Sequence, residues 1–220
     1  MTGVDILYRD DDLVIVNKPS GLLVHRGWDN DEVVMMTLVR DALGVYIHPI
    51  HRLDRGASGA LVFALSAAAA RSLCDAFARG QVEKRYLALV RGIPPEHDVI
   101  DHAIPGKPGG ARVPAVTEIH RLAVYGRYAL VEARPRTGRL HQIRRHLKHI
   151  ACPLIGDVNY GKGEHNRLFR DRYGLHRLAL HAASLTVPHP ADGRPIRADA
   201  PMPADLAAPI ARLARATETP

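Results

Sequence analysis

A short polar loop that runs directly into an apolar stretch is the feature that most constrains this chain. The loop His51–Gly59 places Asp54 between Arg52 and Arg55, and the apolar run Ala60–Leu65 follows at once. A short continuous apolar run beside a turn is typical of a strand that is buried on both faces. The sequence therefore predicts a carboxylate held at the end of a strand in the hydrophobic core.

The two arginines beside Asp54 indicate how this carboxylate is used. Nearby positive charge favours the ionised form of a carboxyl group, so Asp54 is expected to act as a carboxylate and not as an acid. Gly56 and Gly59 allow the backbone to approach closely whatever occupies the loop. The alternative is a turn aspartate that only forms salt bridges.

Further short motifs lie on both sides of this loop. They are Asn-Lys-Pro-Ser-Gly at 17–21, Lys-Arg-Tyr-Leu-Ala-Leu-Val-Arg-Gly at 84–92, Thr-Gly-Arg-Leu-His-Gln-Ile-Arg-Arg-His at 137–146, Ile-Gly-Asp at 155–157 and Leu-Ala-Leu-His-Ala at 178–182. In this order, and with His-Arg-Leu-Asp at 51–54, they resemble the RluA-type family of pseudouridine synthases. The resemblance extends from about Leu7 to about Ile196.

This resemblance implies an α+β fold, with a mixed, largely antiparallel sheet flanked by helices and loops. Strands and helices that mix without regular βαβ alternation favour the same class. We expect residues 1–220 to form a single catalytic domain without an N-terminal S4-like domain, and 200–220 to form its tail. The implied reaction detaches uracil from C1′ of its ribose, rotates it and rejoins it through C5, with no cofactor and no metal.

The resemblance also assigns catalytic roles. Asp54 is the essential carboxylate, and whether it attacks the sugar, adds to the base or removes a ribose proton stays open. Arg144 pairs with Asp54 and keeps it ionised. Tyr86 stacks on the target base and helps to remove the C5 proton; the alternative is an ordinary half-buried strand tyrosine.

Four more residues are expected at the substrate. Arg52 pushes into the space that the flipped base vacates, and Leu180 forms an apolar wall of the pocket. Lys18 and Lys84 support the site or contact phosphate. One departure from the family pattern is Ala57, which stands where the family usually has threonine and so removes one hydroxyl group.

The identity of the RNA is suggested by one segment. Within the family, Leu23–Trp28 and Val33–Met36 resemble most closely the TruC-type group, which modifies tRNA at uridine 65. The same reaction on ribosomal RNA or at another tRNA position is an alternative. A non-catalytic RNA-binding protein is another, and the presence of Asp54, Tyr86 and Arg144 argues against it.

The chain's charge suits an RNA partner. Its 220 residues include 30 Lys and Arg against 23 Asp and Glu, for a net charge of +7. Such a balance favours a polyanionic ligand. With only Cys74 and Cys152, a disulfide framework is not expected. The charged N-terminal segment and the absence of a long apolar run predict a cytoplasmic protein without membrane contact. Nothing in the sequence indicates an obligate protein partner, so we expect a monomer.

The predicted helix Gly138–Ala151 has an apolar stripe at helical spacing. Arg144 lies on the shoulder of this stripe, whereas Arg145 and Lys148 lie further towards solvent. An arginine buried without a partner is costly, so Arg144 requires a carboxylate, and Asp54 is the candidate. The alternative is a solvated arginine.

Three other patterns suggest different chemistry. The run at 156–162 fits the P-loop pattern GxxxxGK, but Gly163 replaces the required Ser or Thr, and no clear helix is expected after Lys162. A metal face formed by His146, His149 and Cys152 lacks a fourth ligand. A hydrolase triad of His51, Asp54 and Ser58 is too crowded within one loop.

Periodicity and turn residues predict the remaining elements. Expected strands are Val4–Tyr8, Leu13–Val16, Leu61–Leu65, Tyr86–Arg91, Val116–Val124, Tyr128–Ala133 and Leu178–Leu185. Besides Gly138–Ala151, expected helices are Met36–Leu43 and one capped by Ser66 that ends at Ala78. We expect a loop or a small irregular insertion over Ile93–Pro114, a long loop over Asp157–Tyr173, and a helical or frayed tail over Ala200–Pro220.

Overall fold

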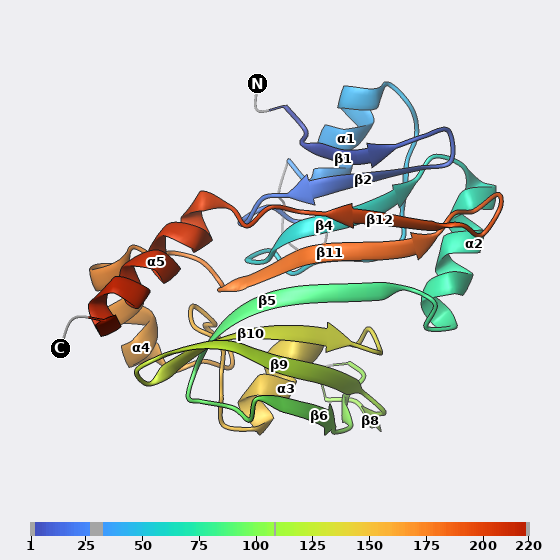
Figure 1. Cartoon of the computed structure of the whole chain (residues 1–220). Helices are drawn as coiled ribbons and strands as arrows, with labels where there is room; N and C mark the ends of the chain where they lie inside the picture. Colours follow the sequence, from blue (N-terminus) through green and yellow to red (C-terminus); the bar gives the residue numbers. More distant parts are fainter. Residues whose placement is uncertain (1–2, 27–32, 108, 219–220) are drawn as a thin grey trace. The chain divides into compact units, whose positions relative to one another are not determined.

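The computed structural model describes residues 3–26, 33–107 and 109–218, and the chain divides into two compact units (Figure 1). Unit 1 comprises Met1–Lys84 and Ala182–Pro201, and unit 2 comprises Arg85–His181 and Met202–Pro220. Each unit is thus assembled from two separate stretches of chain. No helix in the described ranges combines the length and apolar character that a bilayer crossing requires.

Unit 1 contains a sheet with the strand order β1-β2-β4-β11. These strands are β1 (Ile6–Arg9), β2 (Leu13–Lys18), β4 (Ser58–Ala64) and β11 (Leu180–Pro188), of which β11 begins in unit 2. The short β3 (His48–Pro49) pairs with β4, and β12 (Pro195–Asp199) pairs with β11. Every residue of β4 is buried, as the apolar run predicts.

Two helices accompany this sheet. Helix α1 (Met35–Leu43) ends at Gly44, which adopts φ of 68° as a left-handed C-terminal cap. Helix α2 (Ala67–Ala78) begins after Ser66, whose hydroxyl accepts a hydrogen bond from Ala69 N at 3.1 Å. Both boundaries agree with the sequence prediction to within one residue. Helix α2 packs its apolar side into a core that β2, β4, β11 and β12 share.

Unit 2 contains the strand order β5-β10-β9-β6, in which every neighbouring pair is antiparallel. The strands are β5 (Glu83–Arg91), which begins in unit 1, β10 (Tyr128–Pro135), β9 (Val116–Tyr125) and β6 (His97–Asp101). The strands predicted at Val116–Val124 and Tyr128–Ala133 are confirmed, and they pair as the β9–β10 hairpin. The prediction of a loop or small irregular insertion over Ile93–Pro114 missed β6, which is a regular strand of the sheet. The small pair β7 (Ile104–Pro105) and β8 (Arg112–Val113) also lies in this segment.

Helix α3 (Gln142–His149) begins later than predicted. His141 has φ of 54°, a left-handed conformation that an α-helix excludes. The Gln142 side chain holds the preceding segment in a turn: its Oε1 accepts from Thr137 Oγ1 at 2.6 Å and from Arg139 N at 3.0 Å. These bonds replace the first helical turn that the apolar spacing predicts.

The predicted loop Asp157–Tyr173 is also wrong in part. Helix α4 (Gly163–Leu168) and the π-helical turn η1 (Phe169–Tyr173) occupy its second half. The buried Phe169 and Tyr173 pack in one core with Leu206 and Leu213 of α5 (Ala204–Glu218). The chain's C-terminal segment is therefore a packed helix and not a frayed tail.

Candidate active site

The Asp54 loop lies in unit 1, between β3 and β4. Leu53 and Ala57 are buried on either side of the half-buried Asp54, while Arg52 is exposed. The backbone closes a turn here, because Ala57 N donates to Asp54 O at 3.0 Å. The buried apolar neighbours and the closed turn together fix the backbone at Asp54 and therefore the direction of its side chain.

Lys18 supports this loop through hydrogen bonds to backbone oxygens. Its side chain is fully buried, and its Nζ donates to the carbonyl oxygens of Pro19 at 2.8 Å, Leu22 at 2.6 Å and Arg55 at 3.4 Å. Ser20 Oγ adds a bond to Gly56 O at 2.8 Å. A buried ammonium group needs such acceptors. Of its two predicted roles, the contacts of Lys18 favour support of the site over phosphate binding.

His51 fixes the start of the same loop. Its Nε2 accepts a hydrogen bond from Val62 N of β4 at 3.2 Å, and its ring stacks on Phe77 of α2 at 4.9 Å between centroids. Burial, together with the positive charge of Lys84, lowers the pKa of His51 to about 3. His51 is therefore a neutral acceptor, and a hydrolase triad that needs it as a base is not favoured. Burial also lowers the pKa of Lys84 to about 8.

Gly59, directly after the loop, is required by packing between strands. Its φ is +114°, and a Cβ atom there would lie 2.2 Å from Ala182 O of β11. Real Cβ atoms do not approach a carbonyl oxygen so closely, so any side chain would push β11 away from β4. At this glycine, the close approach that the sequence suggested is to a neighbouring strand.

Arg144 projects from α3 in unit 2 into a buried ion pair. Its Nε donates to Asp157 Oδ2 at 2.7 Å and its Nη2 to Asp157 Oδ1 at 2.8 Å. Arg144 and Asp157 are 6% and 1% exposed. The helix projection thus correctly predicts a buried Arg144 that binds a carboxylate, and the pair with Asp157 is one that it did not foresee. The pairing with Asp54 stays a prediction.

Asp157 accepts further hydrogen bonds besides those from the Arg144 guanidinium. Its Oδ1 also accepts from the backbone N–H groups of Asn159 and Tyr160, both at 3.0 Å. Burial alone would raise the pKa of this carboxyl, but the hydrogen bonds from Arg144 and the backbone outweigh it and lower the pKa. Asp157 is therefore ionised and fixes the orientation of the Arg144 guanidinium.

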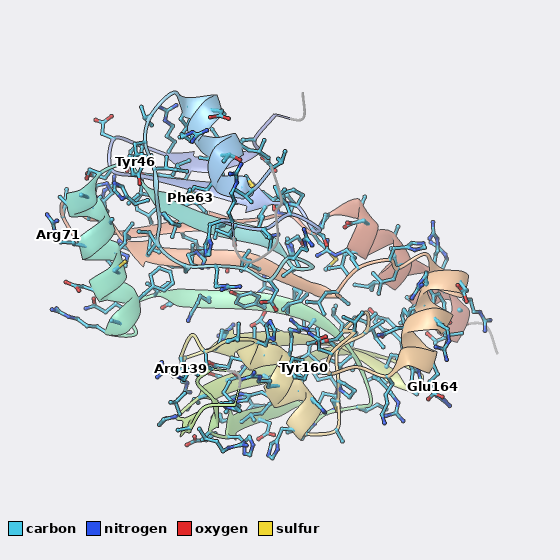
Figure 2. All side chains as sticks on the ribbon, turned by 180° about the vertical axis from the view of Figure 1, so that it is seen from behind. Tyr46, Phe63, Arg71, Arg139, Tyr160 and Glu164 are labelled. Carbon is cyan, nitrogen blue, oxygen red and sulfur yellow. The ribbon has the colours of Figure 1, made fainter. Side chains whose placement is uncertain are left out.

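Tyr160 lies beside α3 (Figure 2). Its hydroxyl accepts from Arg145 Nε at 2.9 Å and lies 3.1 Å from His141 Nδ1, and its ring centroid lies 5.1 Å from the Arg144 guanidinium carbon. Arg145 is thus half-buried and less solvated than predicted, while Lys148 is exposed. Sequence reasoning overlooked Tyr160, and the Ile-Gly-Asp motif just before it is the signal that could have pointed to this turn.

The other predicted site residues have simpler surroundings. Tyr86 is half-buried on β5, opposite Ala133 of β10. Leu180 is buried at the start of β11. Gly27 and Trp28, which contribute to the TruC-type resemblance, lie outside the described residues.

Packing explains the glycines that resemble a P-loop. A Cβ atom on Gly156 would lie 1.9 Å from Arg177 O, and one on Gly161 would lie 2.3 Å from Asp157 O. Helix α4 does follow Lys162, contrary to the prediction, but Gly163 still lacks the hydroxyl that binds magnesium. These glycines allow a tight turn around Asp157.

The face of α3 that might have bound a metal is engaged otherwise. His146 Nδ1 lies 2.9 Å from Thr117 Oγ1, and its Nε2 lies 2.9 Å from His102 O. His149 stacks on His102 with ring centroids 3.6 Å apart, and Cys152 is buried. Both ring nitrogens of His146 are thus hydrogen-bonded, so the arrangement does not favour a metal there.

A basic hollow of about 270 Å³ lies in unit 2, beside α4. Its lining includes Arg167, Arg170, His176 and Arg177 and, among the described residues, no acidic side chain. Arg177 is held by Asp205 at 2.8 Å, while Arg167 and Arg170 are exposed. Exposed arginines around a hollow are suited to phosphate oxygens.

Known proteins resemble this chain in sequence and in fold. Residues 12–149 match the family described as RNA pseudouridylate synthase. The chain is 42% identical to proteins named tRNA pseudouridine synthase C from Vibrio cholerae and Pectobacterium carotovorum; it covers 88% and 60% of their lengths, with 88% and 91% of this chain matched.

Solved structures show the same fold. The human RNA pseudouridylate synthase domain containing 4 protein superposes with a TM-score of 0.79 at 26% identity, covering 95% of this chain and 92% of that one. The domain containing 1 protein gives 0.77 at 28% identity, covering 99% and 96%. The predicted α+β fold and isomerase class are confirmed. This chain belongs to the RNA pseudouridylate synthase family.

Proposed function

We propose that this protein converts one uridine of tRNA, uridine 65, to pseudouridine. The observation that carries the proposal is the 42% identity, over 88% of both chains, to a Vibrio cholerae protein named tRNA pseudouridine synthase C. Ribosomal RNA is the alternative substrate. The enzyme acts as a monomer in the cytoplasm, where it meets tRNA, and needs no obligate protein partner.

The reaction requires access to a glycosidic bond inside an RNA stack. The target nucleotide is flipped out, at a cost of a few kcal/mol, and the exposed Arg52 fills the space it leaves. Leu180 contributes an apolar wall and Tyr86 stacks on the uracil. Flipping thus brings C1′ and the base into reach of the Asp54 carboxylate.

Asp54 supplies the charge for the bond exchange. The C1′–N1 bond breaks and a C1′–C5 bond forms, after which C5 loses its proton with help from Tyr86 and N1 carries one. Nothing is oxidised or reduced. A guanidinium has five N–H donors, so Arg144 can bind Asp157 and also pair with Asp54. In this scheme Asp157 positions Arg144, and Arg144 supplies the counter-charge of Asp54.

The substrate is tested with purified enzyme, bulk tRNA and ribosomal RNA in separate reactions, followed by mapping of pseudouridine. We expect modification at tRNA position 65 and none in ribosomal RNA. Modification confined to ribosomal RNA would retain the chemistry and reject tRNA as substrate. RNA binding without any pseudouridine would instead support the non-catalytic alternative.

RNA binding should weaken steeply with salt, because arginine and lysine displace counterions from phosphates. The rate at saturating RNA should hardly change. Filter binding between 50 and 200 mM salt, beside single-turnover rates, measures both. Arg167→Ala with Arg170→Ala should reduce the slope of log affinity against log salt by about 2, and an unchanged slope would remove the basic hollow from the RNA interface.

Activity should survive excess EDTA and dialysis against buffer free of nucleotides, because the proposed steps need neither metal nor energy. Turnover of the dialysed enzyme checks this. A loss that zinc restores would contradict it.

A further inference from the structure

One face of the unit 2 sheet carries side chains that the proposed reaction does not use. Along β9, Thr117 and Ile119 are buried, on the side of the sheet that α3 covers (Figure 1). Successive side chains of a strand point to opposite faces. Glu118 and His120 therefore project from the face opposite α3, and both are half-buried there.

The register of the edge strand adds a third side chain to this face. Strand β6 pairs antiparallel with β9, and His97 lies directly opposite His120. Glu118 precedes His120 by two residues, so all three side chains share one face of the β6–β9 ribbon. Two imidazoles and one carboxylate thus converge from two strands of fixed register.

The distances suit metal ligands. Glu118 Oε1 lies 3.0 Å from His120 Nε2 and 3.3 Å from His97 Nε2, and one ligand atom from each residue lies within 4.8 Å of the others. Zinc binds nitrogen and oxygen at about 2.0–2.2 Å in a tetrahedron, which separates ligand atoms by roughly 3.3 Å. The Glu118 contacts already match this separation, and the nitrogen atoms of the two imidazoles lie within 4.8 Å of each other.

The neighbours of Glu118 hold its carboxylate in place. Its Oε1 faces the Nε2 atoms of both His120 and His97. Arg136 Nη2 bonds the other carboxylate oxygen, Oε2, at 3.3 Å. Arg136 thus orients Glu118, while Oε1 is the oxygen that faces both imidazoles.

We propose that His97, Glu118 and His120 bind one Zn²⁺ ion, with water as the fourth ligand. The ion joins edge strand β6 to β9. Arg144 and Asp157 project from the α3 side, so the ion takes no part in the isomerisation. Its effect is on the stability of unit 2.

The test uses untagged, EDTA-treated full-length protein and a titration with Zn²⁺ by calorimetry at pH 8. We expect one equivalent to bind and the Tm to rise. Co²⁺ added to the metal-free protein in place of Zn²⁺ should give the visible absorption of a tetrahedral site. Glu118→Gln and His120→Ala should each weaken binding by at least about tenfold.

His149→Ala is the matched control, because it removes an exposed histidine of the same unit that lies outside the proposed site. His149 belongs instead to the other possible metal face, with His146 and Cys152. We expect it to bind Zn²⁺ like the wild type. Metal-free Tm values of the variants near that of the wild type would exclude misfolding as the cause of weaker binding. Failure of the wild type to bind one Zn²⁺, or wild-type affinity in His120→Ala, would overturn the proposal. Neither result bears on isomerase activity, which should be equal with and without the ion.

Discussion

Asp54→Asn should abolish pseudouridine formation, lowering the rate by at least about a thousandfold. Asparagine keeps the shape of the side chain but removes the charge on which the proposed bond exchange depends. The turn should persist, because Ala57 N bonds the backbone oxygen of Asp54 and not its carboxylate. Single-turnover rates with saturating tRNA, beside RNA affinity and thermal unfolding, measure the separate effects.

Asp41→Asn makes the same chemical change at an exposed position of α1, where the carboxylate forms a surface pair with Arg40. It should retain full activity. Appreciable turnover by purified Asp54→Asn would reject Asp54 as the essential carboxylate, whatever its affinity for RNA.

Arg144→Ala should reduce both activity and stability. It would leave the buried Asp157 carboxylate without its guanidinium partner, and breaking a buried ion pair costs about 3–5 kcal/mol. Denaturant unfolding measures that cost. Loss of the positive charge should also lower the single-turnover rate, because Asp54 would lose its proposed counter-charge.

Arg145→Ala is the comparison within the same helix. Arg145 bonds Tyr160 and, at 2.8 Å, Pro105 O, so its loss should cost some stability and mainly weaken RNA binding. At saturating RNA its rate should stay near that of the wild type. Equal rates for the two variants would mean that the assignment of Arg144 is wrong.

The stability term from Asp157 has a defined pH dependence. Its pKa is lowered in the folded protein, so this term is fully present above the unfolded value of about 3.9 and is lost as pH falls through the folded pKa. The stability difference between wild type and Asp157→Asn should therefore be constant near neutral pH and shrink in acid.

Local signals predicted those elements whose causes are local. Ser66 caps α2 with its own hydroxyl, Gly44 ends α1, and the turn between Tyr125 and Tyr128 lies between two strands with clear patterns. Helix α4 and the η1 turn were missed because α4 is short and polar, and because the core around Phe169 includes residues distant in sequence, such as Leu89 and Leu206. The spacing of apolar residues near Phe169 cannot indicate packing partners so distant in sequence.

The site shows the same division. A buried stripe on α3 predicts that Arg144 needs a carboxylate, since that requirement follows from the helix alone. The identity of Asp157 depends on a turn 13 residues away, closed through Gly161. The role of Lys18 was ambiguous in the sequence because its three hydrogen-bond acceptors are backbone carbonyl oxygens. Every residue has such a group, so no side chain in the sequence indicates the contact.

The division of each unit between two stretches of chain affects how the protein can be made. The core of unit 1 packs Leu13 and Val62 with Leu185 and Val187, which a ribosome adds long after the first two. Until β11 emerges, a nascent chain exposes the β4 edge that β11 will occupy. Folding of unit 1 should therefore wait until β11 has been translated, and nascent chains that stop before residue 182 should be clients of chaperones and targets of proteases.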